Sequence, residues 1–312
     1  MLIRVSYSGV CGTDLKIYQG AIPVSYPRIM GHEMVGEVVE ESGNGAFRPG
    51  ERIIIDPVLF CGTCFHCRIG QTHLCQNGQL LGRDVNGGFA ECVAVPASHV
   101  FRLPDSIAGR TAPLIQPLTT CLHAQRLTNI FPGESVVVLG LGVTGQLHIQ
   151  LAKARGASPV IGITRSAAKR ELARKLGADL AVASGNESAQ EVLERTHGRG
   201  ADLAIDTTGV MASLAAAVTM ARFGGRLLLF GINTATQGAL PFYQLYLKEM
   251  TLIHARAAKS EDYPNSIDLV QRGVVRLEPL ISHVMPFEKL PMAIGILDTD
   301  ADQSLKIILE HS

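Results

Sequence analysis

The chain has 312 residues, of which 46% are hydrophobic and 18% charged, and its 28 basic residues balance its 28 acidic residues. This length predicts about two domains, each with its own core. Zero formal net charge argues against a protein that binds nucleic acid or a membrane surface, and no apolar run is long enough to span a bilayer. No segment at the start reads as a secretory leader. We therefore expect a soluble, cytoplasmic protein whose thiols stay reduced.

Residues 1–117 contain short apolar runs interrupted by glycine and proline, such as "LIRVSYSGV" and "ERIIIDP", which predict an irregular β domain. In this region "GVCGTD" places Cys11, Thr13 and Asp14 beside glycine, and "MGHEMVGEV" contains His32 and Glu33. A thiolate, an imidazole and a carboxylate from separate segments are the ligand types of a catalytic zinc site with an open position. A core cysteine and a surface His–Glu pair are the alternatives.

The stretch "FCGTCFHCRIGQTHLC" (residues 60–75) carries four cysteines, separated by two, two and seven residues: Cys61, Cys64, Cys67 and Cys75. Disulfides are disfavoured in a reducing compartment. An iron–sulfur cluster of the bacterial ferredoxin type favours a short last gap followed by Cys-Pro, whereas Cys75 follows a long gap and precedes Gln76. A tetrahedral zinc ion accepts this spacing. Because four thiolates fill its coordination shell, such a site is structural rather than catalytic.

From about residue 134 the pattern changes to buried strands that alternate with helices, with helices expected near 187–196 and 211–222. This alternation predicts a doubly wound parallel sheet. Gly140, Gly142 and Gly145 form G-x-G-x-x-G directly after the strand "SVVVL" and before a helix. In that context the motif predicts a dinucleotide site, with the pyrophosphate at the helix N-terminus. A simple packing turn is the alternative.

The end of the second strand of this sheet should indicate which dinucleotide binds. An NAD site usually has an acidic residue about 20 positions beyond the glycines. Thr164 stands there instead, and the cations Arg165, Lys169 and Arg170 follow. Arg165 could pair with a 2′-phosphate, which favours NADP over NAD. A solvated basic helix start is the alternative. The candidate cofactor residues also include Val143, Thr144 and Thr208.

The motifs together resemble the zinc-dependent medium-chain alcohol dehydrogenases, within them the sorbitol and threonine dehydrogenase branch. The resemblance rests on "CGTD", "GHE", the four cysteines, "LIQPLTTCLHA", "GLGVTG" and "ISHVMPFEKL", which occur in the family's order and extend over essentially the whole chain. It implies a GroES-like catalytic domain (1–117 and 259–312) with a structural zinc lobe, and a dinucleotide-binding Rossmann domain (118–258).

The resemblance also implies residue roles. Cys11 and His32 match catalytic zinc ligands, and Glu33 matches the glutamate that binds or supports the zinc. Asp14 matches the carboxylate that orients the zinc histidine, and Thr13 matches the hydroxyl that accepts the substrate's proton. Cys61, Cys64, Cys67 and Cys75 match the structural zinc site, so two zinc ions per chain are expected. Lys306, in "QSLKIIL", matches a basic residue on the cofactor's pyrophosphate.

Three features depart from the family's pattern. Gln116, in "LIQPL", stands where the polyol branch has glutamate, and it could bind zinc through its amide oxygen. Lys16 stands where many relatives have a proton-relay histidine. Cys11 comes earlier than in relatives, which indicates a misplaced start, a shortened chain or a truncated variant. Lost N-terminal strands would expose a sheet edge and weaken the catalytic domain.

The predicted function is hydride transfer between NAD(P) and a secondary alcohol, namely a polyol, sugar or hydroxy amino acid. A dinucleotide-binding protein with structural zinc and an impaired catalytic site is the alternative, and a zinc-free quinone or enal reductase is a weaker third. The expected partners are the small-molecule substrate and a second copy of the chain, as a homodimer or homotetramer paired near "GGRLLLFGI". Cys92, Cys121 and His123 are expected to be buried packing residues.

Overall fold

The computed structural model describes residues 1–41, 45–235, 237–300 and 302–312 and divides the chain into two compact units. Unit 1 comprises residues 1–119 and 257–312, and unit 2 comprises residues 120–256. The predicted domain boundaries differ from this division by two residues at each junction. The first junction falls inside helix α3 (Ile115–Thr128).

Unit 1 is built mainly from short, mostly antiparallel strands. Its strands are β1 (Leu2–Val10), β2 (Glu33–Glu40), β3 (Arg52–Ile55), β4 (Val58–Leu59), β5 (Gln79–Leu80), β6 (Cys92–Ala94), β7 (Val100–Arg102), β14 (Ile281–Pro286) and β15 (Lys306–Glu310). Its other helices are α1 (Gly12–Tyr18), α2 (Phe65–Arg68), α9 (Asp262–Gln271) and α10 (Leu290–Thr299). Among the described residues, seven strands form one sheet in the order β14-β15-β1-β2-β3-β7, with β6 paired to β1.

The N-terminal strand β1 lies in the interior of this sheet. It pairs with β2 along most of its length, with β15 at its C-terminal half and with β6 at its N-terminal end. The side chains of Ile3 and Val5 are buried in one apolar cluster with Ile53 and Ile55 of β3. The sheet edge that the sequence led us to expect is therefore not at β1.

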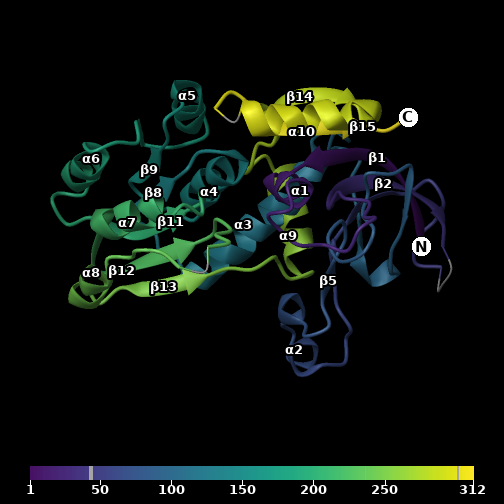
Figure 1. Cartoon of the computed structure of the whole chain (residues 1–312), viewed down its shortest axis with the longest axis horizontal. Coiled ribbons are helices and arrows are strands. Elements are labelled where there is room, and N and C mark those ends of the chain that lie inside the picture. Colours follow the sequence, from purple (N-terminus) through teal and green to yellow (C-terminus); the bar gives the residue numbers. More distant parts are fainter. Residues whose placement is uncertain (42–44, 236, 301) are drawn as a thin grey trace. The chain divides into compact units, whose positions relative to one another are not determined.

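The four-cysteine lobe (residues 60–78) projects from unit 1 at the bottom of Figure 1. The two-stranded ladder of β4 and β5 joins its two ends, with Val58 opposite Leu80 and Leu59 opposite Gln79. Inside the lobe the only α-helix among the described residues is the four-residue α2. So short a helix buries little surface, and the lobe needs another source of order.

Unit 2 confirms the predicted doubly wound parallel sheet. Its strands are β8 (Val136–Leu139), β9 (Val160–Ile163), β10 (Leu180–Val182), β11 (Ala201–Asp206), β12 (Ala221–Leu229) and β13 (Thr251–His254), and its helices besides α3 are α4 (Val143–Ala154), α5 (Ala167–Lys175), α6 (Ser188–Arg195), α7 (Met211–Met220) and α8 (Phe242–Leu247). The strand order is β10-β9-β8-β11-β12-β13, and Figure 1 labels all of these strands except β10. The chain reverses direction across the sheet between β8 and β11, the place where ligands bind in such folds.

Helices cover both faces of this sheet, as the unbroken apolar strand "VVVL" predicts. Val136 and Val138 of β8 pack in one core with Ile149 of α4, whereas Val137 and Leu139 pack in a second core with Leu214 of α7. Several boundaries differ from the prediction by one to three residues, and α6 spans Ser188–Arg195 rather than 187–196. Helix α7 ends at Met220 rather than at 222, and β12 begins directly afterwards, before its expected glycines.

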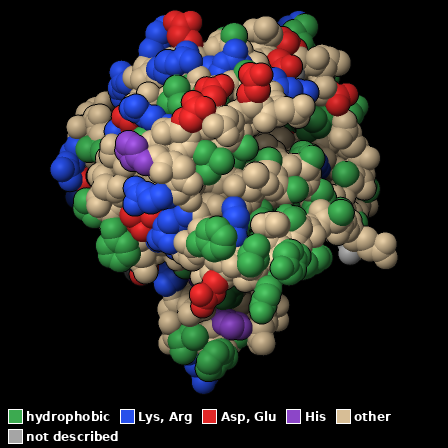
Figure 2. All heavy atoms as spheres, turned by 90° about the vertical axis from the view of Figure 1, so that its left-hand side faces the viewer, with side chains coloured by type: hydrophobic (Ala, Val, Ile, Leu, Met, Phe, Trp, Pro, Cys, Tyr) green, Lys and Arg blue, Asp and Glu red, His purple; other side chains and the backbone are tan. Residues whose placement is uncertain are grey.

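The visible face in Figure 2 mixes basic and acidic side chains with hydrophobic groups. Mixed charge of this kind is consistent with the balanced composition. No helix within the described ranges has the length and apolar character needed to cross a membrane.

Asp56, which directly follows β3, links the first segment of unit 1 to residue 260, near the point where the chain re-enters this unit. Its side chain is buried and accepts hydrogen bonds from the Ser260 hydroxyl (2.6 Å) and the Val58 amide (3.0 Å). Burial raises the pKa of Asp56 to about 6, helped by nearby Asp262 and opposed by the two hydrogen bonds. The folded protein therefore holds this proton more tightly than the unfolded chain, so stability falls as pH rises from about 4 through about 6.

We expect Asp56→Asn to stabilise the protein above pH 7, by up to about 3 kcal/mol, because a neutral amide avoids the cost of a buried charge. At pH 4 the gain should vanish, since Asp56 is then protonated in the folded state. Urea unfolding between pH 4 and pH 8 measures both effects. Ser260→Ala is the control and should destabilise above pH 7, because it removes a donor to the carboxylate. A loss of stability in Asp56→Asn at pH 8 would contradict this account.

Candidate metal centre and dinucleotide site

Cys11, His32 and Glu33 come together in unit 1 and are called the donor cluster here. One ligand atom from each lies within 4.8 Å of the others. Cys11 sits between β1 and α1, and Glu33 begins β2, directly after His32. Because β1 and β2 pair antiparallel, with Gly9 opposite Glu33, the two sequence-distant motifs meet at one end of the strand pair. A sulfur, an imidazole nitrogen and a carboxylate oxygen at this separation suit a zinc ion.

Asp14 lies beside His32, and its predicted role in orienting the ring stays a prediction. An Asp14 carboxylate oxygen lies 3.3 Å from His32 Nδ1, and the other oxygen accepts a hydrogen bond from the Cys11 amide at 2.9 Å. This leaves His32 Nε2 as the ligand atom. Burial alone would lower the pKa of His32, but Asp14 and Cys11 together hold it well above its ordinary value. A metal would have to displace this proton, so its affinity should fall at low pH.

Glu33 also contacts a buried cation. Lys306 Nζ lies 2.5 and 2.7 Å from the two carboxylate oxygens and donates a third hydrogen bond to the Val10 carbonyl at 3.2 Å. Burial alone would lower the pKa of Lys306, but Glu33, Cys11 and Asp14 hold it above its ordinary value. The contact that the structure provides for this ammonium is therefore Glu33, and the pyrophosphate role of Lys306 remains a prediction.

The four lobe cysteines also come together. Cys64 Sγ lies 3.5 Å from Cys67 Sγ and 3.9 Å from Cys75 Sγ, and Cys75 Sγ lies 3.5 Å from Cys61 Sγ. A tetrahedron with Zn–S bonds of about 2.3 Å has sulfur–sulfur edges of about 3.8 Å. The sulfur positions therefore fit one zinc ion with no open coordination position.

The electrostatics of the lobe also favour a cation. The Thr63 hydroxyl and amide, with the Cys64 amide and Cys75, lower the pKa of Cys61 to about 5, whereas burial and Cys64 raise the pKa of Cys67 to about 12. The set is therefore not fully ionised at neutral pH on its own. A bound zinc would stabilise all four thiolates, release the remaining protons and order the lobe.

In unit 2 the glycine-rich turn (residues 140–145) has the geometry of a phosphate-binding turn. Gly140 adopts φ +86°, and Gly142 precedes the first turn of α4. A Cβ on Gly145 would lie 1.9 Å from the Gly140 carbonyl oxygen, so only glycine allows the turn to pack this closely on the helix. The free amides at the start of α4 can then bind an anion.

The cations beyond β9 differ in their surroundings. Arg165 is exposed, whereas Lys169 is buried. The Arg170 guanidinium donates to the carbonyls of Thr164 (2.9 Å) and Arg165 (2.6 Å), which fixes the end of the strand. Of these three cations, Arg165 is the most exposed.

The remaining predicted residues differ in their burial and contacts. Thr13 is half-buried on α1, and Gln116 is buried in the first turn of α3. Their roles toward zinc and substrate stay predictions. Thr208 is exposed, and its hydroxyl donates to Asp206 at 2.7 Å. Cys121 and His123 are buried as expected, but Cys92 is exposed on β6, because its side chain alternates with the buried Val93.

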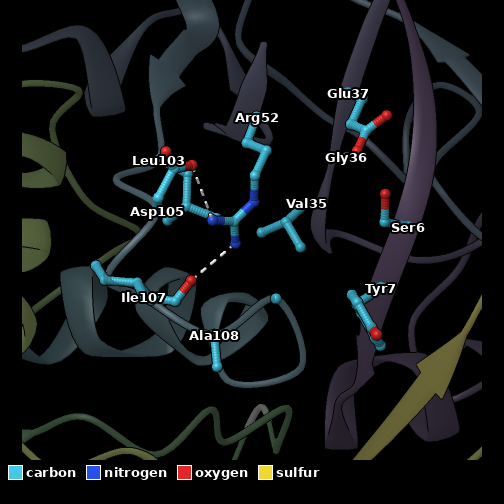
Figure 3. A pocket seen from close by; sticks show the side chains of 11 residues that line it. Ser6, Tyr7, Val35, Gly36, Glu37, Arg52, Leu103, Asp105, Ile107 and Ala108 are labelled. Carbon is cyan, nitrogen blue, oxygen red and sulfur yellow. Dashed lines mark hydrogen bonds and ion pairs between the residues drawn. The ribbon is translucent and has the colours of Figure 1, made fainter. Parts of the chain in front are cut away.

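A separate cavity of about 350 Å³ lies in unit 1 and contains none of the predicted ligands. It is lined by parts of β1, β2 and β3 and by residues 103–109 (Figure 3). Arg52 occupies its centre, where the guanidinium donates to the carbonyls of Ile107 (2.7 Å) and Pro104 (3.3 Å) and lies 3.5 Å from Asp105. This cation stabilises the loop, and the donor cluster remains the candidate reactive site.

Comparison with known proteins identifies the family to which the chain belongs. Residues 1–105 match the family described as "Alcohol dehydrogenase GroES-like domain", and residues 143–272 match "Zinc-binding dehydrogenase". The chain belongs to the zinc-binding alcohol dehydrogenase family. Within this family it is similar to an uncharacterized zinc-type alcohol dehydrogenase-like protein of Haemophilus influenzae, with 33% identity over 98% of this chain and 90% of the relative.

Two further relatives carry named activities. A 2-dehydro-3-deoxy-L-galactonate 5-dehydrogenase of Pseudoalteromonas atlantica is 32% identical over 99% of this chain and 90% of the relative. An L-threonine 3-dehydrogenase of Pyrococcus abyssi is 34% identical over 91% of this chain and 83% of the relative. Both names describe dehydrogenases of small hydroxylated molecules, which places the chain in the polyol branch of the family.

Solved dehydrogenase structures share the fold. Alcohol dehydrogenase TADH from Thermus sp. ATN1 has a TM-score of 0.91 at 30% identity, covering 100% of this chain and 92% of that one. A zinc-binding dehydrogenase from Sinorhizobium meliloti bound to NADP has a TM-score of 0.92 at 30% identity, covering 99% and 91%. The RspB alcohol dehydrogenase of Escherichia coli, complexed with NADH, has a TM-score of 0.91 at 29% identity, covering 99% and 91%.

Proposed function

We propose that this chain is a zinc-dependent oxidoreductase that transfers hydride between NAD(P) and a secondary alcohol. The observation that carries the proposal is the donor cluster, in which Cys11, His32 and Glu33 offer ligand atoms within 4.8 Å of one another. The glycine-rich turn in unit 2, whose geometry suits a phosphate, also supports the proposal. A protein that used zinc only for structure would have no need of the donor cluster, so the cluster does not favour the binding-only alternative.

The chain's own residues would act as follows. Cys11 and His32 hold the metal, and Asp14 keeps the His32 ring in the orientation that exposes Nε2. Glu33 and, through its amide oxygen, Gln116 are the further candidate ligands. Thr13, two residues after Cys11, would accept the proton of the substrate hydroxyl. When bound, zinc would supply a Lewis acid that lowers the pKa of that hydroxyl, and the nicotinamide would supply the hydride acceptor.

The proposed substrate is a polyol, a sugar or a hydroxy amino acid. The names of two relatives, a galactonate derivative dehydrogenase and a threonine dehydrogenase, support this class. The neutral Gln116 is compatible with this class, although the polyol branch has glutamate at this position.

The proposed cofactors are two zinc ions per chain and NADP or NAD, with NADP favoured. Arg165, exposed beyond β9, is the residue proposed to pair with a 2′-phosphate. We expect Arg165→Ala to raise the KM for NADP by roughly 10-fold and to leave the KM for NAD unchanged, because only NADP carries that phosphate. Steady-state kinetics with both cofactors measure this.

The exposed Arg195 at the end of α6 provides a control of equal charge change in the same unit, and Arg195→Ala should alter neither KM. Equal effects of Arg165→Ala on both cofactors, or no effect on either, would count against the NADP preference.

We also propose a homodimer or homotetramer in the cytoplasm. The expected pairing region "GGRLLLFGI" is β12, which lies one strand inside the sheet; the edge strand is β13. Exposed apolar residues lie on β13 and on the neighbouring α8, among them Leu252, Phe242 and Tyr246. An apolar sheet edge of this kind supports association with a second copy. The cytoplasm would keep the zinc-binding thiols reduced.

The proposal is tested by zinc content and turnover on the same preparation. Elemental analysis should find two zinc ions per chain, and reduced nicotinamide should form when sorbitol, galactitol or L-threonine is supplied with NADP or NAD. One zinc ion that is lost only when a lobe cysteine is replaced, together with no turnover of any alcohol, would refute the proposal.

A further inference from the structure

Thr207, the residue directly after β11, holds the start of the glycine-rich turn from the neighbouring strand. Its hydroxyl oxygen lies 2.8 Å from the Gly140 carbonyl oxygen and 3.0 Å from the Leu139 carbonyl oxygen. Its backbone amide also donates to the Leu139 carbonyl at 3.0 Å. β8 and β11 are adjacent parallel strands, so their carboxyl ends lie at the same edge of the sheet. One side chain thus bonds to the last residue of β8 and the first residue of the turn.

The packing around Gly140 shows why the Thr207 hydroxyl can approach the Gly140 carbonyl so closely. A Cβ on Gly140 would lie 2.7 Å from the Thr207 hydroxyl oxygen and 2.7 Å from a Thr208 methyl carbon. On the other side, the Gly140 carbonyl oxygen lies against Gly145 at the start of α4. This carbonyl is therefore held between the Thr207 hydroxyl and the helix. Because the peptide is planar, fixing the carbonyl also fixes the direction of the Leu141 amide and the path of the turn.

The next carbonyl of the turn, that of Leu141, also accepts a hydrogen bond from a protein side chain. The buried Gln146 side-chain amide lies 3.3 Å from the Leu141 carbonyl oxygen and 2.8 Å from the Lys169 carbonyl oxygen. With both carbonyls turned towards donors of the protein, the amides that follow at the start of α4 are left for an anion. The glycines allow this close turn, but it is side-chain donors that select its orientation.

We propose that Thr207 is a positioning residue for the dinucleotide: its hydroxyl fixes the Gly140 carbonyl and so aligns the amides that bind the pyrophosphate. This inference rests on the proposed function, because it assumes that the turn binds a dinucleotide. Thr207 does not touch the cofactor in this account and acts only through the turn. A turn that is already ordered in the free protein binds the cofactor more tightly, because no free energy is lost in ordering it on binding.

The test compares Thr207→Val, which keeps the shape and removes the hydroxyl, with Thr207→Ser, which keeps the hydroxyl. Cofactor affinity is measured by fluorescence titration of the full-length chain with NADPH and NADH in the absence of an alcohol. We expect Thr207→Val to raise both Kd values about 10-fold, the loss expected for one such hydrogen bond, and Thr207→Ser to stay within about two-fold of the wild type. At saturating cofactor, kcat should be unchanged while the KM for cofactor rises.

Calorimetric titration with ADP-ribose and with adenosine separates positioning from a general loss of structure. Thr207→Val should weaken ADP-ribose, which has the pyrophosphate, and should leave adenosine unaffected. Equal Kd values for wild type and Thr207→Val, or equal weakening of both probes, would overturn the inference. If Thr207→Val does not fold, Thr207→Ala is the second variant without the hydroxyl. A wild-type chain that binds neither NADPH nor NADH would instead overturn the proposed function itself.

Discussion

Cys11→Ser is expected to remove one of two zinc ions and to lower kcat by at least about 10³-fold. A serine hydroxyl does not ionise at neutral pH and is a poor zinc ligand, so the donor cluster would keep only His32 and Glu33. The four-cysteine lobe has its own complete ligand set and should retain its zinc. Elemental analysis per chain and steady-state turnover of an accepted alcohol measure the two effects.

Cys92→Ser is the matched control for this experiment, because Cys92 is exposed on β6 and belongs to neither cysteine site. It should retain both zinc ions and full activity. Cys61→Ser should give the converse loss, with the lobe zinc gone and thermal stability reduced. A Cys11→Ser protein that kept two zinc ions and wild-type kcat would show that the donor cluster is not the reactive centre.

Lys306→Met is expected to lower the melting temperature of the zinc-free chain by roughly 10 °C, because without zinc it leaves the Glu33 carboxylate buried without a counter-ion. The two side chains are 4% and 1% exposed and 2.5 Å apart. Removing one partner of such a pair costs about 3–5 kcal/mol, and a protein of this size loses about 2–4 °C per kcal/mol. Glu33 holds the pKa of Lys306 above its ordinary value, so this stabilisation is present at neutral pH and is lost only as pH rises through the raised pKa.

Thermal unfolding followed by circular dichroism at neutral pH measures this effect. The double variant Glu33→Gln/Lys306→Met should recover most of the loss, since it leaves no uncompensated charge. The exposed pair Lys175–Glu171 provides the control, and Lys175→Met should leave the melting temperature unchanged. A Lys306→Met protein that melts within 2 °C of the wild type would mean that the Glu33–Lys306 pair does not stabilise the fold.

The local chemistry of this protein could be predicted from the sequence because each motif is short. The spacing of Cys61, Cys64 and Cys67 already limits the lobe to a metal site, since consecutive thiols two residues apart can converge on one ion. The glycine motif likewise lies within one strand–turn–helix unit, so its geometry depends on nearby residues. The alternation of strands and helices after residue 134 predicts the doubly wound sheet for the same reason.

Contacts between distant residues could not be predicted in this way. No sequence pattern indicates that Lys306, predicted to contact the cofactor, contacts the Glu33 carboxylate, because 273 positions separate the two residues. Cys92 looked buried from its apolar neighbours, but side chains alternate across a strand and the register of β6 places it outside. Thr207 lies outside the glycine motif, and only the pairing of β11 with β8 brings its hydroxyl to the turn.

The sequence by itself determined the predicted chemistry of this chain: two candidate sets of metal ligands, a candidate dinucleotide turn and an α/β unit joined to an irregular β unit. Residue type and short spacing are enough for this, because ligand chemistry and backbone preference are local properties. Only the tertiary structure decided which other groups face one another, namely Lys306 with Glu33 and Thr207 with Gly140. Strand register and the pairing of segments far apart in the chain set these contacts, and the free energy that selects them comes from the whole packed core rather than from any single motif.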